Sequence, residues 1–207
     1  MPTNDPIRVA ASCFLFLLSA CATQEQQPER YLLVQGTVPH SHSRFVICSR
    51  AGCEETARIQ LRGSDWQSIH SLFMPPAVDS DTERKQIAEA IALMEQLVSS
   101  QAGTQDDQPA GQGVFRGTRQ LDCVAETTNT TVYLVLMRNQ GLLKWHRVGY
   151  PEHRGVFHLL APHNTAVLIE NDTNRRFAVD AYYHANGQQP EIVPLDTWSR
   201  GYKPEGS

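Results

Sequence analysis

Residues 121–126, Leu-Asp-Cys-Val-Ala-Glu, form the stretch around which the rest of the chain is organised. Asp122 is a good N-cap residue, and no Gly or Pro occurs from Cys123 to Met137, so a helix is predicted to begin at Cys123. Gly141 is placed to end it. The Thr-rich middle of this segment has poor helix propensity, so tertiary packing must hold it. The stretch therefore predicts a cysteine in the first turn of a packed helix.

Upstream of this helix, short strands are predicted before two helices. Residues 31–38 and 44–48 carry β-branched and aromatic residues, which predicts a β-hairpin or two short strands, and residues 57–61 alternate like another strand. Asp65 is expected to cap a short helix, and residues 74–76, Met-Pro-Pro, should stop it. That short helix would place four apolar residues on one face: Trp66, Ile69, Leu72 and Phe73.

A longer helix and a long loop come next. Ser80 and Glu83 match a capping box, and the apolar stripe that follows predicts a helix ending before Gly103. The stripe consists of Ile87, Ile91, Met94 and Val98. Residues 102–119 read as a loop, which at this length is often functional and is expected to form one wall of a cleft. Asp106 and Asp107 within it either bind a cation or form a solvated acidic turn.

Downstream of the helix the pattern is mainly β. Residues 142–148 predict a strand closed by Gly149, Tyr150 and Pro151, residues 162–170 predict a second strand, and a turn at 171–174 leads into a third at 176–183. Residues 192–193 and a small helical piece near 197–198 finish the chain. Helices packed on an antiparallel sheet define an α+β class.

Composition limits the choice of partners. The chain has 207 residues, 41% of them apolar, and a net charge of -4, which fits one globular domain with a short leader. Charged residues make up 19% and form no basic run, so nucleic acid is not an expected partner.

The N-terminal residues are typical of an exported protein. Residues 9–18 are apolar and have the length of a secretory signal core rather than of a membrane span. Residues 18–21, Leu-Ser-Ala-Cys, resemble the lipobox of bacterial lipoproteins. The resemblance implies a signal peptide of residues 1–20, a lipid on the Cys21 thiol, and a bilayer as partner. The alternative is an ordinary signal peptide that happens to carry a cysteine.

The same resemblance suggests where the protein resides. Ala22, rather than Asp, implies sorting to the outer membrane, with the domain facing the periplasm. The Gln/Glu-rich residues 21–30 would be a lipidated tether, and residues 31–207 a single domain.

The five cysteines can be assigned by elimination. Cys13 leaves with the leader and Cys21 would carry lipid. Cys48 and Cys53 are close enough to pair across a tight turn in an oxidising compartment. Cys123 is then left over, and such a thiol is buried and inert, paired between chains, or reactive.

The position of this leftover thiol favours reactivity. The first turn of a helix favours the thiolate through the helix dipole and free N–H groups, although the adjacent Asp122 works against it. A histidine normally secures such an ion pair. With a two-residue turn at 171–172, His163 lies directly across from Asp180, and with a four-residue turn at 171–174 they are diagonal neighbours. Both registers place the two side chains on one face, whereas a three-residue turn would not.

This order of a cysteine at a helix start, a histidine on a strand and an aspartate on the next strand resembles the bacterial transglutaminase-like cysteine peptidases, a branch of the papain-like fold. The resemblance rests on Asp122-Cys123, on residues 163–168 (His-Asn-Thr-Ala-Val-Leu) and on Val179-Asp180, and it covers about residues 120–183. Relative to the usual pattern, an Asn-Thr pair is inserted after the histidine.

The resemblance implies roles for these residues. Cys123 would be the nucleophile, His163 the general base and then acid, and Asp180 the group that orients the imidazole. The Cys123 N–H and the side chain of Gln120 would form an oxyanion hole. The reaction would be acyl transfer at an amide of a peptide or cell-wall substrate, giving hydrolysis with water or cross-linking with an amine. No cofactor is implied.

Simpler interpretations exist for each residue. Cys123 can be a small buried apolar side chain, His163 can bond to backbone, and Asp180 can pair with Arg175 or Arg176. The protein would then be a non-catalytic envelope lipoprotein that uses the fold for binding.

The remaining histidines and the tryptophans carry weaker signals. Trp66, Trp145 and Trp198 are predicted to be core or rim aromatics. No metal site is expected, because the spacing of the remaining histidines fits no ligand motif. Six of these histidines would be the candidates for such a site: His40, His42, His146, His153, His158 and His184.

Overall fold

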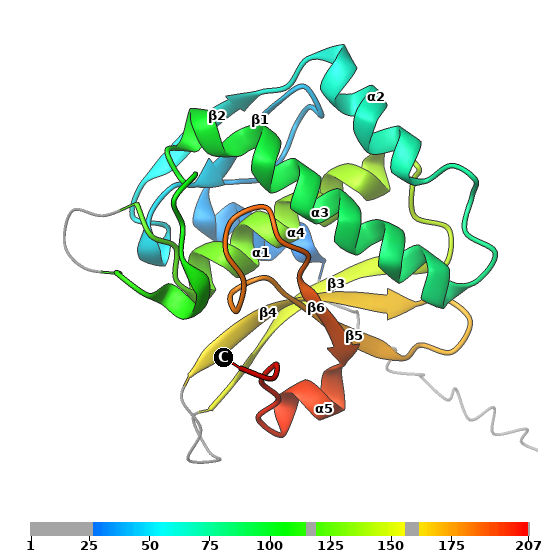
Figure 1. Cartoon of the computed structure of the whole chain (residues 1–207). Helices are drawn as coiled ribbons and strands as arrows, with labels where there is room; N and C mark the ends of the chain where they lie inside the picture. The colour runs from blue at the N-terminus through cyan, green and yellow to red at the C-terminus, as the bar shows by residue number, and fades with distance from the viewer. Residues whose placement is uncertain (1–26, 115–118, 156–161, 207) are drawn as a thin grey trace, which may run out of the picture.

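The structure is a computed structural model that describes residues 27–114, 119–155 and 162–206. It combines helices with antiparallel sheets, so the predicted α+β class is confirmed (Figure 1). The predicted signal peptide, Cys21 and His158 lie outside the described residues. Within the described part, no helix is both long and apolar enough to span a bilayer.

The first element is a helix, so the strand predicted at residues 31–38 is wrong. α1 spans Pro28–Gln35, beginning inside the segment assigned to the tether. Pro28 stands in the first turn, where a missing N–H costs nothing, and Gly36 closes the helix with a left-handed φ of 69°. These two end signals define a helix although the segment predicted as a strand contains β-branched and aromatic residues.

A disulfide-closed hairpin follows. β1 (Arg44–Cys48) pairs antiparallel with β2 (Thr56–Gln60), and a short 3₁₀ helix, Ala51–Cys53, lies between them. Cys48 and Cys53 are joined by a disulfide, as their spacing predicts. The predicted strands at 44–48 and 57–61 are confirmed.

The two helices predicted next are present, but both have different caps. α2 spans Gly63–Leu72, and Asp65 lies in its first turn, where its carboxylate accepts the Arg62 N–H at 2.7 Å. α3 spans Ser80–Ala102, and its N-cap is Asp79, whose carboxylate accepts the Thr82 N–H at 2.7 Å.

The predicted capping box of α3 is therefore wrong. Glu83 is buried, and its carboxylate accepts the N–H groups of Lys144 and Trp145 at 2.7 and 3.0 Å. A tertiary contact thus uses the side chain that the local pattern assigned to capping. The predicted end of α3 is confirmed, because Gly103 closes it with a left-handed φ of 73°.

The main sheet is an antiparallel meander of order β3-β4-β5-β6. Its strands are β3 (His146–Arg154), β4 (His163–Glu170), β5 (Arg176–Asp180) and β6 (Glu191–Pro194). The prediction for β3 is wrong at both ends, since the strand starts later than residue 142 and continues through 149–151. Its pairing with β4 shifts between Gly149 and Glu152, and this irregularity accommodates the proline at 151.

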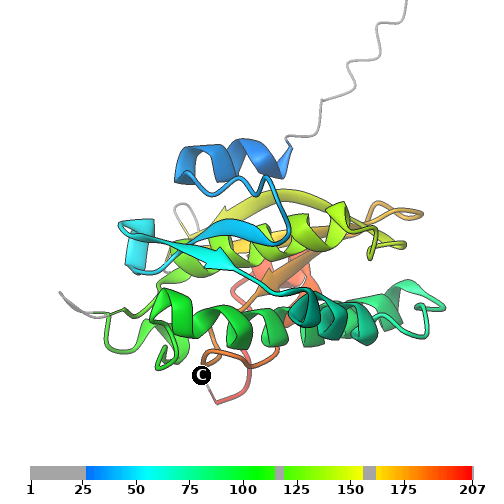
Figure 2. The same cartoon turned by 90° about the horizontal axis from the view of Figure 1, so that it is seen from above.

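α4 (Cys123–Asn139) is the central helix, with α1 on one side and α3 on the other (Figure 2). Every residue from Ala125 to Met137 is buried. Its threonines are tolerated because hydroxyls bond back along the helix, as Thr131 does to the Thr127 carbonyl at 2.7 Å. Packing holds this helix, as its composition requires.

The two faces of the main sheet bury different partners. Ala166, Leu168 and Val179 belong to the large core that contains α4. Val167 and Ala178, which alternate with them along the strands, pack in a smaller cluster with α5 (Leu195–Ser199). The sheet is therefore a shared wall, with α4 on one face and α5 on the other.

Candidate active site

Cys123 is the first residue of α4, as predicted. The Asp122 carboxylate caps the helix by accepting the Ala125 N–H at 3.0 Å, and the same oxygen accepts the Gly52 N–H at 2.9 Å. Cys123 is a free thiol and is partly exposed. The interpretation as a buried, inert apolar side chain is therefore wrong.

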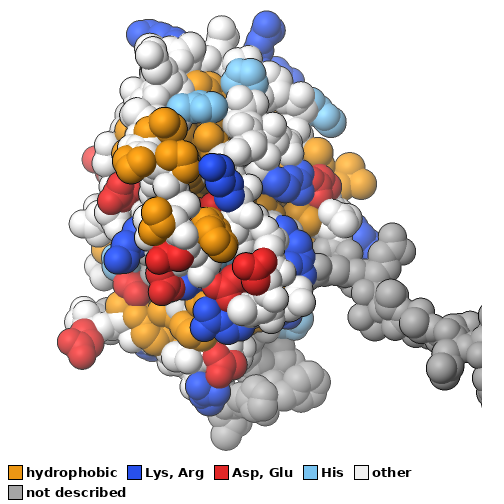
Figure 3. All heavy atoms as spheres, turned by 90° about the vertical axis from the view of Figure 1, so that its right-hand side faces the viewer, with side chains coloured by type: hydrophobic (Ala, Val, Ile, Leu, Met, Phe, Trp, Pro, Cys, Tyr) orange, Lys and Arg blue, Asp and Glu red, His pale blue; other side chains and the backbone are white. Residues whose placement is uncertain are grey.

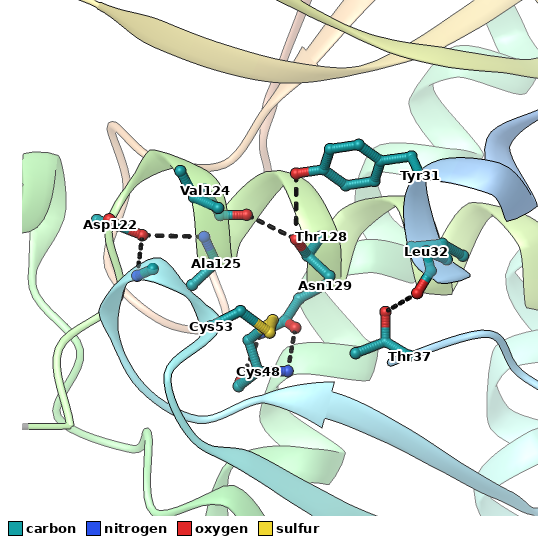
Figure 4. Close-up of a disulfide and its surroundings, with 11 residues drawn as sticks. Tyr31, Leu32, Thr37, Cys48, Cys53, Asp122, Val124, Ala125, Thr128 and Asn129 are labelled. Carbon is teal, nitrogen blue, oxygen red and sulfur yellow. Dashed lines mark hydrogen bonds between the residues drawn. A yellow bond between two sulfur atoms is a disulfide. The ribbon is translucent and has the colours of Figure 1, made fainter. Parts of the chain in front are cut away.

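The disulfide hairpin supports this end of the helix. The Asn129 side chain accepts the Cys48 N–H at 2.8 Å and donates to the Cys48 carbonyl at 3.0 Å, one turn and a half beyond the cysteine (Figure 4). Leu121 and Ala125 pack against Cys48 in a small apolar cluster. The hairpin and the start of α4 are thus held together on both sides of Cys123.

His163 and Asp180 meet through the longer of the two predicted turns. Ile169 pairs with Arg176, so the turn comprises residues 171–174 and the two side chains are diagonal neighbours. His163 Nε2 lies 2.7 Å from Asp180 Oδ2, and both side chains are buried. The predicted contact is confirmed.

The two arginines that precede Asp180 along the chain, Arg175 and Arg176, have other partners. Arg175 pairs with Glu170 at 2.9 Å, and Arg176 pairs with Glu152 at 2.8 Å. The simpler interpretation of Asp180 as a partner of these arginines is therefore wrong.

The electrostatics of His163 connect the pair to the cysteine. Burial alone would lower the pKa of His163, but hydrogen bonds to Asp180 and Cys123 outweigh it, and the pKa is raised. His163 therefore interacts with the Asp180 carboxylate through Nε2 and is close enough to Cys123 for the thiol to contribute to its raised pKa. The structure thus brings together all three residues that the sequence selected.

Asn164, which follows His163 in β4, also reaches the sulfur. Its Nδ2 donates to Cys123 Sγ at 3.6 Å. Gln120 is used differently: its Oε1 accepts the Gln108 N–H at 2.7 Å and its Nε2 donates to the Asp106 carbonyl at 2.8 Å. The oxyanion role assigned to Gln120 stays a prediction, and its amide holds the preceding loop in place.

Trp198 binds Asp180, and Arg154 in turn packs on Trp198. The sequence did not indicate that either residue belongs to the site. Trp198 Nε1 donates to Asp180 Oδ2 at 2.7 Å from a fully buried ring. The Arg154 guanidinium lies 4.4 Å from the centroid of that ring and donates to the Tyr183 hydroxyl at 3.0 Å. No spacing or pattern in the sequence connects β3, β5 and α5 in this way, so only the fold reveals the contact.

Tyr182 connects the loop after α3 to His163. The two rings have centroids 4.9 Å apart, and the Tyr182 hydroxyl donates to the Ala110 carbonyl at 2.8 Å while the Ala110 N–H donates to the Tyr182 carbonyl at 2.6 Å. Gly111 allows this approach, because a Cβ there would lie 3.2 Å from the tyrosine ring. The described part of the predicted loop therefore borders the site.

Three buried carboxyl groups lie beside this loop. Asp107 accepts the Leu121 N–H at 2.6 Å and hydrogen-bonds to Glu126, whereas Glu95 accepts the Gly187 N–H at 2.8 Å. Burial raises the pKa of Asp107 to about 6 and that of Glu95 to about 8, and burial together with the neighbouring acids raises the pKa of Glu126 well above its usual range. Asp107 is not part of a solvated turn, so that interpretation is wrong for this residue.

No metal arrangement is present in the described part of the chain. There, no group of three or more His, Cys, Asp or Glu side chains is placed to hold an ion. Comparison with models of protein families, with curated proteins and with solved structures found no match. The arrangement of the side chains is therefore the basis for the chemistry of the site.

Apolar surface and open hollows also occur away from Cys123. On the face shown in Figure 3, apolar side chains gather in separate patches broken by charged groups. Met74 and Val78, between α2 and α3, are 67% and 79% exposed. A hollow of about 440 Å³ next to them is lined by residues including His70, Phe73 and Leu142, and none of its lining residues belongs to the site.

Proposed function

We propose that this chain is a cysteine-dependent acyl-transfer enzyme of the papain-like, transglutaminase-like type that acts on amide bonds. The observation that supports it is the 2.7 Å hydrogen bond between His163 and Asp180 beside a free cysteine at a helix start, with Cys123 and Asp180 both raising the pKa of His163. A raised pKa of this histidine means that the site favours imidazolium beside the sulfur, which is the ion pair that such a nucleophile needs.

The proposed steps use only these side chains. The Cys123 sulfur adds to the carbonyl carbon of the amide, and the carbonyl electron pair moves to the oxygen. The proton held by His163 passes to the leaving nitrogen as the C–N bond breaks, which leaves a thioester on Cys123. His163 then takes a proton from water as the water oxygen adds to the thioester carbon. The adduct collapses with cleavage of the C–S bond, which releases the carboxylic acid and restores the Cys123 thiolate beside the His163 imidazolium. Asp180 holds the imidazole in one orientation throughout.

The proposal includes location and substrate class. The lipobox-like residues 18–21 support a lipid anchor at Cys21 in the bacterial outer membrane, with the domain in the periplasm. A disulfide between Cys48 and Cys53 is consistent with an oxidising compartment. Peptides and cell-wall peptides are the amides present there. Water as acceptor gives hydrolysis, and an amine gives cross-linking.

Alkylation of Cys123 tests the proposal on the detergent-solubilised full chain. Iodoacetamide labelling at about pH 6, read for the Cys123 peptide by mass spectrometry, should be roughly tenfold faster in the wild type than in His163→Ala, because an unassisted thiol is mostly protonated there. His40→Ala, which removes an exposed histidine, is the matched control and should label like the wild type.

An equal rate in the wild type and His163→Ala would contradict the proposal. The site would then have no activated thiol, and the protein would be a non-catalytic binding module of the envelope.

A further inference from the structure

Asn164 approaches the sulfur from a different side of β4 than His163 does. Neighbouring residues of a strand point to opposite faces, so Asn164 shares its face with Ala166 and Leu168, which pack in the core that contains α4. Its Nδ2 is 3.6 Å from Cys123 Sγ. The amide therefore lies on the α4 side of the strand, next to the first turn of the helix.

We propose that the Asn164 side-chain amide is an oxyanion-hole donor for acyl transfer at Cys123, acting together with the Cys123 backbone N–H; the inference rests on the proposed function. When the sulfur adds to a carbonyl carbon, the electron pair of the C=O bond moves to the oxygen. That oxyanion is two bonds from the sulfur, so a donor within reach of Sγ is within reach of the oxygen.

The chemistry of the contact supports this role. The resting contact with the sulfur is long, at 3.6 Å, so it is readily exchanged for a shorter bond to an anionic oxygen. A neutral amide donates without giving up its proton, and it therefore leaves proton transfer to His163. The N–H of Cys123 belongs to the first helical turn, whose N–H groups have no intrahelical acceptor.

The Gln120 amide is less available for this task. One end accepts the Gln108 N–H and the other donates to the Asp106 carbonyl, so moving it toward the sulfur would break both bonds. Asn164 is attached to the strand that carries the histidine, which fixes its position relative to the reacting atoms.

Two reactions of the same thiol separate an oxyanion donor from a group that only supports the thiolate. Acylation by p-nitrophenyl acetate passes through a tetrahedral oxyanion and releases p-nitrophenolate. Alkylation by iodoacetamide displaces iodide at a methylene carbon and forms no oxyanion. In single-turnover measurements on the full chain, Asn164→Ala and the nearly isosteric Asn164→Leu should acylate roughly 100-fold more slowly than the wild type. Their alkylation rates should stay within about threefold, because thiolate formation depends on His163.

The outcomes are distinct. Asn171→Ala, at the far end of β4, where the side chain donates to the Lys144 carbonyl, is the matched control and should acylate like the wild type. Unchanged acylation in both Asn164 variants would overturn the inference while leaving the proposed function intact. An equal loss of acylation and alkylation would also overturn it, because Asn164 would then support the thiolate or the local fold. Wild-type acylation no faster than that of Cys123→Ala would remove the proposed function and the inference with it.

Discussion

Among the residues that the structure describes, two buried histidine–carboxylate pairs have similar chemistry but different neighbours. His163 Nε2 is 2.7 Å from Asp180, and His146 Nδ1 is 2.9 Å from Glu83. The second pair joins α3 to β3 with Arg84 Nη1 3.0 Å from the other ring nitrogen, so both nitrogens are used structurally. In the first pair, Cys123 contributes with Asp180 to the raised pKa of the histidine. Residue type alone does not distinguish an active-site histidine from one that joins two elements.

Replacing Asp180 by Asn should lower the pKa of His163, because the carboxylate bond and charge raise it. The folded-state pKa of His163 lies above its unfolded value of about 6.5, so the interaction stabilises the fold fully below that pH. It is lost as the pH rises through the folded pKa. The loss of unfolding free energy in Asp180→Asn should therefore be larger at about pH 5 than at about pH 9, as measured by denaturant titration with NMR titration of the imidazole.

A pH-independent loss would contradict the assignment of charge to this pair. His146→Gln serves as a comparison, because it changes the structural pair and should leave the His163 titration unchanged.

Replacing Trp198 by Phe should keep the ring beneath Arg154 and remove the N–H that donates to Asp180. A hydrogen bond to a buried carboxylate contributes about 2 kcal/mol, so the unfolding free energy should fall by roughly that amount. Trp145→Phe is the matched control: its indole N–H donates to a neutral carbonyl, that of Ala77, at 3.2 Å, and its loss should be nearer 1 kcal/mol. Equal losses in denaturant unfolding would argue against a charged acceptor at Asp180.

At the scale of elements, the carboxyl groups between α3, α4 and the intervening loop link local packing to pH. Glu95, Asp107 and Glu126 keep their protons in the fold at pH values where the unfolded chain has lost them. The titratable neighbours of this cluster are Asp180, which interacts with Glu126, and Tyr133, which interacts with Glu95 and Glu126. The first is another acid and the second is a phenol. This cluster holds the segment that leads into Cys123 through the Leu121 N–H.

The sign of this effect is opposite to that of a carboxylate whose pKa is lowered by a salt bridge. Because the folded-state pKa values are raised, stability is greatest below about pH 4 for these groups and falls as the pH rises toward about 8. Glu126→Gln removes one titrating group, so the decline in unfolding free energy between about pH 5 and about pH 8 should be shallower, by up to about 1.4 kcal/mol per pH unit. Denaturant unfolding at both pH values measures it.

Glu89→Gln changes an exposed glutamate on α3 and should follow the wild-type pH dependence. If Glu126→Gln instead followed the wild-type pH dependence, Glu126 would already be ionised in the fold over this range, because a group ionised in both states exchanges no protons on unfolding.

At the scale of the whole molecule, α1 lies directly after the predicted lipid anchor and beside the site. The Tyr31 hydroxyl lies 3.2 Å from the Thr128 hydroxyl, within the first two turns of the helix that begins at Cys123 (Figure 4). A lipid at Cys21 would therefore place the proposed active site close to the membrane surface, since only a few residues separate Cys21 from Pro28.

Replacing Cys21 by Ser should release the protein from the membrane, because no thiol remains to carry the acyl chains that anchor it. Fractionation of bacteria expressing the full chain should find the wild type in the membrane pellet and Cys21→Ser in the soluble envelope fraction, with the lipid mass on the N-terminal peptide of the wild type alone. Cys123→Ser should stay in the pellet. A wild type found in the soluble fraction would contradict lipidation.

Much of the local structure follows from the sequence because its causes are local. Asp122 and the absence of helix breakers predict α4, Gly103 predicts the end of α3, and the spacing of Cys48 and Cys53 predicts their disulfide. The failures are also informative. The β-branched and aromatic residues of 31–38 predict a strand there, whereas Pro28 and Gly36 are the end signals of the helix that forms.

Side chains alternate between the two faces of a strand, so the residue numbers and the turn length together decide whether two cross-strand residues share a face. A turn of two or four residues places His163 and Asp180 on the same face. The sequence left the turn length open between two and four residues, and tertiary pairing selected four.

By itself, then, the sequence determined which cysteine is unpaired, where its helix begins, and which histidine and aspartate share a face of a sheet. Only the tertiary structure decided that the sulfur meets that histidine, that Asn164 points to it, and that Trp198 holds the aspartate. The reason is physical: capping, periodicity and turn closure act between residues near in sequence, whereas these contacts join α4, β4 and α5, whose positions are fixed by burying both faces of one sheet.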